Sequence, residues 1–467
     1  MIWSHVYDPL VRPLLSTLVA LLPLAALLGL LAGAGWSAHA AAAAGLATAL
    51  AVAVGVVGMP ADAALAAALH GAAFGLFPIG WIIVTAMFLY RLSVDAGALD
   101  IMKRSVTSLS ADHRMQALLI AFSFGAFLEG AAGFGAPVAI SAALLTGAGF
   151  PALEAAVLAL IANTAPVAFG ALGTPIVTLA KVTGLDEHAI SQMAGRQLPV
   201  FSLLVPAWMV ATMAGWQGLV EVWPAVLVCG GSFAVVQFLM ANHVGAALVD
   251  VVAGIASLVA LAAFLRCWQP RTCWRHGEAK RGLAEKRGQA HHAQQDVPVP
   301  FLGSARAVVW AWSPWAFLSI AVFCWGLPAV KATLEGRPHP PGHAGGAHPQ
   351  QPLLPKRFVA PEFPVPRLDG RVAKVPPATR EPQEIERAVY RLNWLSAAGT
   401  GILAAALVAV PWLGIPWRRA AAIWLDNLRR LSLSLVTIAL MLALAALMGL
   451  LVWLQAGPLA WMVPAAP

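Results

Sequence analysis

The residue with the clearest chemical potential is an acid inside an apolar, glycine-rich segment. Glu129 lies within FSFGAFLEGAAGFGAP, residues 122–137, where its neighbours are small or apolar. A charged residue such as Asp at the centre of a membrane helix costs about 2.5–3.5 kcal/mol, so an acid at that depth is neutral, paired or facing water. A carboxyl that gains and loses a proton there is what coupling to protons requires. We therefore predict that Glu129 is a proton-coupling residue.

The residues after Glu129 predict an interrupted helix. Gly133 and Gly135 let the backbone leave helical geometry, and Pro137 removes a donor and clashes with the preceding turn. Free amides at the start of a half-helix carry partial positive charge and can hold a small carboxylate, which makes Gly133 and Gly135 candidate substrate-binding positions. The alternative is that the glycines only let helices pack closely and that Glu129 is a paired structural acid.

A second interruption is predicted at NTAPVAFGALGTP, residues 163–175. Asn163, Thr164 and Thr174 place amide and hydroxyl groups beside helix-breaking Pro and Gly residues. Such groups suit the carboxylate and hydroxyl of a small hydroxy acid, so these three residues are candidate substrate contacts. Equally, they can serve only to satisfy the backbone carbonyls that a proline kink frees.

Three further charged residues lie close to predicted spans. Arg196, in MAGRQLP at residues 193–199, is a candidate substrate-binding residue because a lone guanidinium can bind an anion. The competing interpretation is that Arg196 extends to the lipid headgroups. Glu154 and Asp250 lie near the ends of predicted spans, where solvated acids are ordinary.

Composition predicts the elements that must position these residues. Hydrophobic residues make up 60% of the 467-residue chain and charged residues 11%, against about 25% in soluble domains. Apolar runs of eighteen residues and more indicate an all-α, polytopic membrane protein, with roughly 10 to 12 spans and broken or re-entrant helices near its core. This composition excludes a soluble enzyme, a coiled coil and a disordered scaffold. The four cysteines are scattered, and we expect neither a metal site nor a cofactor.

The apolar runs place the predicted spans along the chain. They fall at about 14–35, 38–58, 74–92, 201–218, 223–240, 247–268, 310–329, 393–410 and 431–454. Residues 115–182 are also apolar but do not divide into 20-residue pieces, so the number of crossings there stays open.

The distribution of charge predicts the domain organisation and the orientation. We predict a transmembrane core at 1–268, a basic cytoplasmic loop at 269–303, one span at 304–330, a mobile external loop without an apolar face at 331–392, and C-terminal spans at 393–467. Basic residues in short loops mark the cytoplasmic side, which places the N-terminus outside. The net charge of +8 is interpreted as this topology signal, and not as a site for nucleic acid.

Three of these segments also carry a family resemblance. Residues 124–140, 163–170 and 193–199 closely resemble the L-lactate permease family, and the opening WSHVYDP at residues 3–9 is similar to it too. The resemblance runs to about residue 440. It implies a bacterial inner-membrane carrier, not an enzyme, that takes up L-lactate and often glycolate together with protons. It implies no residue roles, so those above come from chemistry, and the oligomeric state is left open.

The C-terminal region departs from the family pattern. The resemblance implies further polar, membrane-embedded sequence after residue 454, and the residues here do not look like that continuation. The alternative to a carrier is therefore a truncated remnant that cannot transport. A channel is a second alternative. A membrane-embedded enzyme is disfavoured, because the chain has no Asp-Asp pair and its one HxxxH spacing, at His339 and His343, lies in a Pro/Gly-rich loop.

Overall fold

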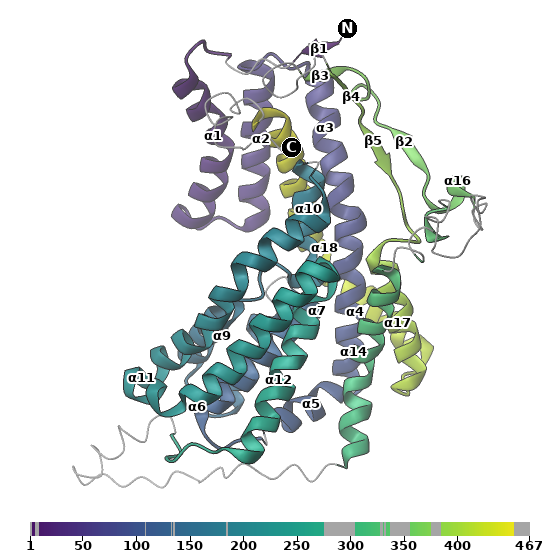
Figure 1. Cartoon of the computed structure of the whole chain (residues 1–467). Coiled ribbons are helices and arrows are strands. Elements are labelled where there is room, and N and C mark those ends of the chain that lie inside the picture. Colours follow the sequence, from purple (N-terminus) through teal and green to yellow (C-terminus); the bar gives the residue numbers. More distant parts are fainter. Residues whose placement is uncertain are drawn as a thin grey trace, which may run out of the picture. The chain divides into compact units, whose positions relative to one another are not determined.

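The protein is described from a computed structural model, which confirms an all-α, polytopic membrane protein (Figure 1). The structure describes residues 2–4, 9–107, 109–131, 133, 136–183, 185–274, 304–326, 330, 333–336, 355–374 and 384–452. Within these ranges, seven helices are long and apolar enough to cross a membrane. Gly135 lies outside the described residues, as does most of the predicted basic loop at 269–303.

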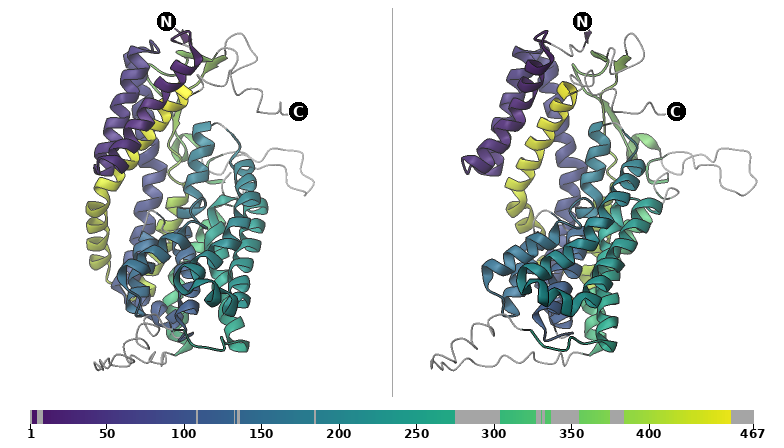
Figure 2. Two further views of the ribbon diagram at one scale, coloured as in Figure 1. Left: turned by 90° about the vertical axis from the view of Figure 1, so that its left-hand side faces the viewer. Right: turned by 60° about the vertical axis from the view of Figure 1, so that its left-hand side comes forward.

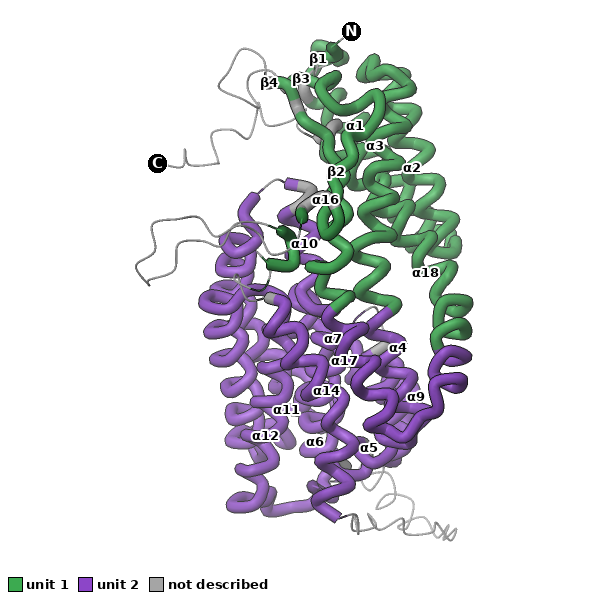
Figure 3. Tube along the Cα trace, turned by 90° about the vertical axis from the view of Figure 1, so that its right-hand side faces the viewer, with its two compact units in different colours: residues 1–84, 327–400, 424–467 green, residues 85–326, 401–423 purple. Residues whose placement is uncertain are grey.

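The chain forms two compact units, each built from segments that are distant in sequence (Figure 3). Unit 1 comprises Met1–Val84, Leu327–Thr400 and Trp424–Pro467, and unit 2 comprises Thr85–Gly326 and Gly401–Ile423. The domains that we predicted are consecutive stretches of chain. Neither unit is consecutive, because helices that are far apart in the sequence pack together within each of them.

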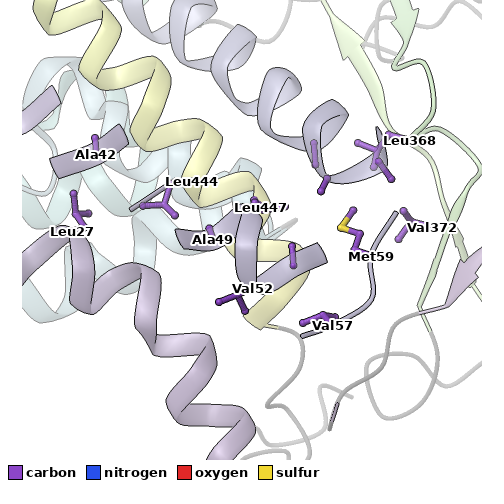
Figure 4. Packing of buried hydrophobic residues seen from close by; sticks show 14 of the residues in the cluster. Leu27, Ala42, Ala49, Val52, Val57, Met59, Leu368, Val372, Leu444 and Leu447 are labelled. Carbon is purple, nitrogen blue, oxygen red and sulfur yellow. The ribbon is translucent and has the colours of Figure 1, made fainter. Parts of the chain in front are cut away.

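Unit 1 is built on helices from both ends of the chain. It contains α1 (Pro13–Leu28), η1 (Gly29–Gly33), α2 (Ala38–Gly55), α3 (Ala61–Phe74), η2 (Gly75–Gly80) and most of α18 (Trp417–Val452). α1 and α2 lie side by side (Figure 2), and Leu27, Ala49 and Leu444 share one apolar core (Figure 4). α3 contacts the backbone of α18 at Gly71, where a side chain would collide with Leu442.

Short strands complete unit 1 within the segment where we predicted a mobile loop. β1 (Trp3–Ser4) pairs in parallel with β3 (Val372–Lys374), which pairs antiparallel with β4 (Glu384–Glu386). β2 (Glu362–Pro364) pairs antiparallel with β5 (Val389–Arg391), and α16 (Lys356–Val359) precedes them. The prediction that this segment has no apolar face is wrong for Leu368 and Val372, which are buried in the unit 1 core. Strands of two or three residues are too short to leave a pattern in the sequence.

Unit 2 is a helical bundle that contains every described candidate site residue. Its helices are α4 (Trp81–Asp95, of which all but the first turn lies here), α5 (Ala98–Thr107), α6 (His113–Gln116), η3 (Ala117–Phe124), α7 (Gly125–Ala131), α8 (Ala136–Gly147), α9 (Ala152–Asn163), α10 (Gly170–Thr183), α11 (Glu187–His243), η4 (Ala246–Leu248), α12 (Val249–Cys267), α14 (Ala305–Gly326) and most of α17 (Ala398–Trp412).

The 57-residue α11 is two helices joined at Gly215. Gly215 has φ 70° and ψ −178°, outside helical geometry. The predicted span at 201–218 therefore ends just past this break, and the span at 223–240 lies wholly in the second half. The halves pack on each other, since the buried Ser202 hydroxyl donates to Gln237 Oε1 over 2.7 Å.

A buried arginine joins the ends of three elements of unit 2. Arg114, which the sequence offered only as a topology signal, has a side chain with 0% exposure. Its guanidinium donates to Asp112 Oδ2 over 2.7 Å, to Glu221 Oε2 over 2.8 Å and to the Thr272 carbonyl over 2.9 Å. The arginine thus connects α6, the second half of α11 and the segment after α12.

Candidate functional site

Both predicted helix interruptions are present, and they lie against each other. α7 ends at Ala131 and α8 begins at Ala136, with Gly133 between them at φ +57°. α9 ends at Asn163, and a turn leads into α10, whose first residues are not helical. A Cβ at Gly133 would lie 2.6 Å from Ala171 Cβ, so the two breaks are in direct contact and only glycine fits at residue 133.

The start of α10 is a left-handed turn. Ala171, Leu172 and Gly173 have φ values of 45°, 58° and 73°. A non-glycine residue in this conformation costs about 1–3 kcal/mol and persists only where its surroundings hold it, as at ligand-binding and switch regions. Here Thr174 donates to the Ala171 carbonyl, and a Cβ at Gly173 would lie 2.7 Å from the carbonyl oxygen of Ala246. The turn is therefore held by its own side chains and by η4.

Glu129 lies beside these breaks and is 5% exposed. The side chain of Asn163, at the end of α9, is its hydrogen-bonding partner. Its other carboxyl oxygen, Oε2, is buried and has no hydrogen-bond partner among the described residues. The position thus matches the sequence prediction of an acid away from water and next to unwound backbone.

A matched pair of glycine substitutions tests how tightly Glu129 is held. A Cβ at Gly170 would lie 2.5 Å from Glu129 Oε1, so Gly170→Ala must displace the carboxyl or shift α10. We expect it to lower the free energy of unfolding by about 1–3 kcal/mol, the usual cost of overpacking. Thermal unfolding of the purified protein in detergent measures this.

Gly231→Ala is the control, because a Cβ built at that position in α11 meets no atom within 4 Å among the described residues, apart from its own stretch of helix. Alanine there is expected to be neutral or slightly stabilising, since it favours the helix over glycine. Equal unfolding temperatures for the two variants would mean that Gly170 does not constrain Glu129.

A second acid faces Glu129 from α12. Asp250 is 1% exposed, and it interacts electrostatically with Glu129. A Cβ at Gly130 would lie 2.8 Å from Asp250 Cβ, so the two helices are in close contact here. The prediction that Asp250 is an ordinary solvated acid is wrong, because the start of α12 is buried against a glycine of α7 and does not lie at the protein surface.

A hydroxyl without a partner lies one helical turn away. Ser141 of α8 is 1% exposed, and its Oγ makes no hydrogen bond within the part of the chain that the structure describes. A Cβ at Gly125 would lie 3.0 Å from that oxygen. Gly125 precedes Glu129 by four residues, which places both on the same face of α7.

The other predicted contacts have local partners. Thr164 is exposed and donates to the Ile161 carbonyl over 2.7 Å, as expected of a side chain that satisfies a freed carbonyl. Arg196 is exposed, and its Nε donates to Asn242 Oδ1 over 3.2 Å. The structure therefore brings together Glu129, Asn163 and Gly133, and gives Thr164 and Arg196 partners other than Glu129.

The residues that sequence reasoning missed are Asp250 and Ser141. Asp250 interrupts the apolar run from residue 246 to 265 with apolar residues on both sides, the same signal that singled out Glu129. Ser141 has no such signal, because serine is common in membrane helices. Among the described residues, no group of three His, Cys, Asp or Glu could hold a metal ion.

Comparisons with known proteins agree with this architecture. A family model described as L-lactate permease matches residues 16–454. The glycolate permease GlcA and the L-lactate permease of Escherichia coli K12 are each 42% identical to this chain over 95% of its length and 76% of theirs. The L-lactate permease of Bacillus subtilis 168 is 43% identical over 94% of this chain and 75% of its own length. No solved structure matches.

Proposed function

The chain belongs to the L-lactate permease family, and we propose that it is a secondary active transporter that takes up L-lactate in symport with protons. Glycolate and related 2-hydroxy monocarboxylates are proposed as further substrates, since one relative is named a glycolate permease. The chain is a multi-pass membrane protein, and we place it in the inner membrane of a bacterial cell. Its relatives are permeases, and no enzymatic activity is proposed.

The observation that carries the proton part of this proposal is the burial of Glu129 beside two interrupted helices. The carboxyl is 5% exposed, and one of its oxygens has no hydrogen-bond partner in the described ranges. Broken helices at membrane depth occur where the backbone is buried in protein or lines a cavity, and transporters form substrate sites there. An acid in that position can exchange a proton with a bound anion close by.

The anion site is proposed at the two helix starts. α8 and α10 begin beside Gly133, and the amides at the start of a half-helix attract a carboxylate. Asn163 and Thr174 are proposed to bind the substrate carboxylate or hydroxyl, and Gly133 and Gly135 to let it approach the backbone. Thr164 and Arg196 are kept as proposed contacts. All four side chains have partners in the structure, which they would exchange or share on binding.

In the proposed mechanism, binding of the substrate anion is coupled to protonation of Glu129. Glu129 binds a proton from outside as the anion binds, and rocking of the bundle then opens the site to the cytoplasm. The empty site holds one carboxylate, and the loaded site holds one substrate carboxylate and a neutral Glu129. Both carry a single negative charge, so the cycle is electroneutral and a pH difference alone drives it.

Transport by the purified protein in proteoliposomes tests this function. Uptake of labelled lactate is expected to be faster when unlabelled lactate is present inside, an acceleration that a channel does not show. A pH difference of about one unit, acid outside, should accumulate lactate about tenfold, because 1.4 kcal/mol corresponds to a factor of ten. Absence of any flux would overturn the proposal, as a transport-incompetent remnant gives none. Flux that internal lactate does not accelerate would indicate a channel.

A further inference from the structure

We propose that Asp250 is the second carboxyl of the proton site, and that Glu129 and Asp250 bind protons as one pair. The inference deepens the proposed function and rests on it for the role of the proton, but the existence of the pair can be tested without transport. Sequence position alone made Asp250 an ordinary acid at a span end, so the pairing comes entirely from the packing of α7 against α12.

Packing brings the two acids together. α12 is packed along α7, and both Gly130 and Gly254 remove side chains from the contact. A Cβ at Gly130 would lie 2.6 Å from the Val251 nitrogen, and one at Gly254 would lie 2.5 Å from the Phe127 nitrogen. No side chain separates the two helices at these points. Asp250 therefore packs directly against Gly130, which is the residue after Glu129 in the sequence.

Burial leaves both acids in need of a partner. Asp250 is 1% exposed, and neither Oδ1 nor Oδ2 accepts a hydrogen bond from a described residue. Glu129 Oε2 is in the same situation. Buried polar atoms are nearly always hydrogen-bonded, because an unsatisfied one is costly. A proton held between the two carboxyls would convert one acceptor into a donor and satisfy an oxygen on each side.

The charges around the pair include no cation with a described contact to it. α12 packs against α7, η3, η4, α10 and α11, and α7 also packs against α8 and α9. α8 has no titratable residue, and the one titratable residue of α9 is Glu154, at the opposite end of that helix from Asn163. η3 and η4 have no titratable residue. On α11, each of these titratable residues has a partner elsewhere or is exposed: Glu187 and His188 are exposed, Arg196 bonds Asn242, Glu221 bonds Arg114, Cys229 contacts Ser123 and Ser257, and His243 is exposed. Lys181 is the one titratable residue of α10, and its side chain is not among those described.

Two facing carboxylates without a cation are not both ionised in a poorly solvated site. The empty pair therefore holds one proton and one negative charge. Asn163 donates a hydrogen bond to Glu129, whereas neither oxygen of Asp250 accepts one from a described residue, so we assign the negative charge to Glu129 and the resident proton to Asp250. Loading adds one proton from outside to Glu129 together with the substrate anion. The net charge is one negative in both states, which agrees with electroneutral symport.

The pH profile of lactate exchange tests whether Asp250 belongs to the unit. Groups that interact strongly titrate as a pair, so removing one member must change the profile of the other. Asp250→Asn nearly preserves the shape of the side chain. We expect the variant to exchange lactate with a pH profile that is displaced from the wild-type profile by about one pH unit or more. Glu187→Gln, an exposed acid at the start of α11, should leave the profile unchanged.

Infrared difference spectroscopy tests the pair without transport. Protonated carboxyls have a distinct C=O stretching band, and a pH change should alter that band in the wild-type protein in detergent. Labelling aspartate carboxyls with carbon-13 should shift part of the pH-dependent band, and labelling glutamate should shift the rest. Because the chain has other aspartates, Asp250→Glu, which keeps a carboxyl at this position, assigns the band to Asp250. It should move the aspartate part of the band to the glutamate label, even if Asp250→Asn fails to fold.

The outcomes separate the two proposals. If wild-type protein transports no lactate but the infrared band responds to both labels and Asp250→Glu moves its aspartate part, the pair exists and the proposed function fails. If wild-type protein transports lactate while Asp250→Asn has the wild-type profile, or if Asp250→Glu leaves the aspartate part of the band in place, Asp250 is not part of the proton site and the inference is overturned.

Discussion

Replacing Glu129 by Gln is expected to abolish the accumulation of lactate by a pH gradient while leaving exchange of bound substrate in place. Glutamine has nearly the same shape but carries no exchangeable proton, so anion binding is no longer tied to protonation. With a pH difference of about one unit, the ratio of internal to external lactate should fall from about ten to about one. Uptake and exchange in the same proteoliposome preparation measure the two activities side by side.

The exposed acid Glu187 provides a control for the Glu129 substitution. Glu187→Gln removes the same charge at the start of α11, away from the breaks, and should accumulate lactate like the wild-type protein. Loss of both accumulation and exchange in Glu129→Gln, with a normal elution profile, would indicate a role in binding rather than in coupling. Undiminished accumulation would remove Glu129 from the mechanism.

Replacing Arg114 by Met is expected to lower the free energy of unfolding by more than Gly170→Ala does. Arg114 is fully buried against Asp112, whose side chain is 3% exposed, so the substitution leaves a carboxylate buried without its cation. Breaking a buried ion pair from one side costs about 3–5 kcal/mol. Glu221 adds little to this cost because its side chain is 30% exposed and can be solvated. Unfolding by denaturant in mild detergent measures the difference.

Two further variants show whether the lost stability comes from the stranded charge. The double variant Asp112→Asn, Arg114→Met should recover part of it, since asparagine can still accept from the backbone amide of residue 114 without carrying a charge. Arg418→Met, at an exposed position of unit 2, should change stability by about 0.5 kcal/mol or less, as is usual for surface sites. A double variant no more stable than the single one would assign the loss to packing instead.

The helix interruptions could be predicted from the sequence because their causes are local. Glycine and proline change the backbone wherever they stand, and the segments at 122–137 and 163–175 each contain several of them. The left-handed turn at Ala171 and Leu172 could not be predicted from residue type, because neither residue favours that conformation. In the folded chain the turn packs against Gly133 and η4, which are contacts that residue type does not reveal.

Packing decides which of the charged residues are buried and which are exposed. Arg114 and Arg196 both looked like arginines near a membrane surface, yet Arg114 is buried in an ion-pair network and Arg196 is exposed on Asn242. Similarly, Asp250 and Glu187 are both acids in the first turn of an apolar helix, and only Asp250 is enclosed. Residue type and position along a span do not separate these cases, because burial depends on the neighbouring helices.

By itself, the sequence determined that the chain is a helical membrane protein of the L-lactate permease family with an acid beside broken helices. Hydrophobicity and backbone propensity act over a few neighbouring residues, and such effects can be read along the chain. Only the tertiary structure decided that the two breaks touch, that Asp250 faces Glu129, and that helices from both ends of the chain share one core. These are contacts between residues far apart in sequence, and they arise from how glycine-lined helices fit together rather than from any local pattern.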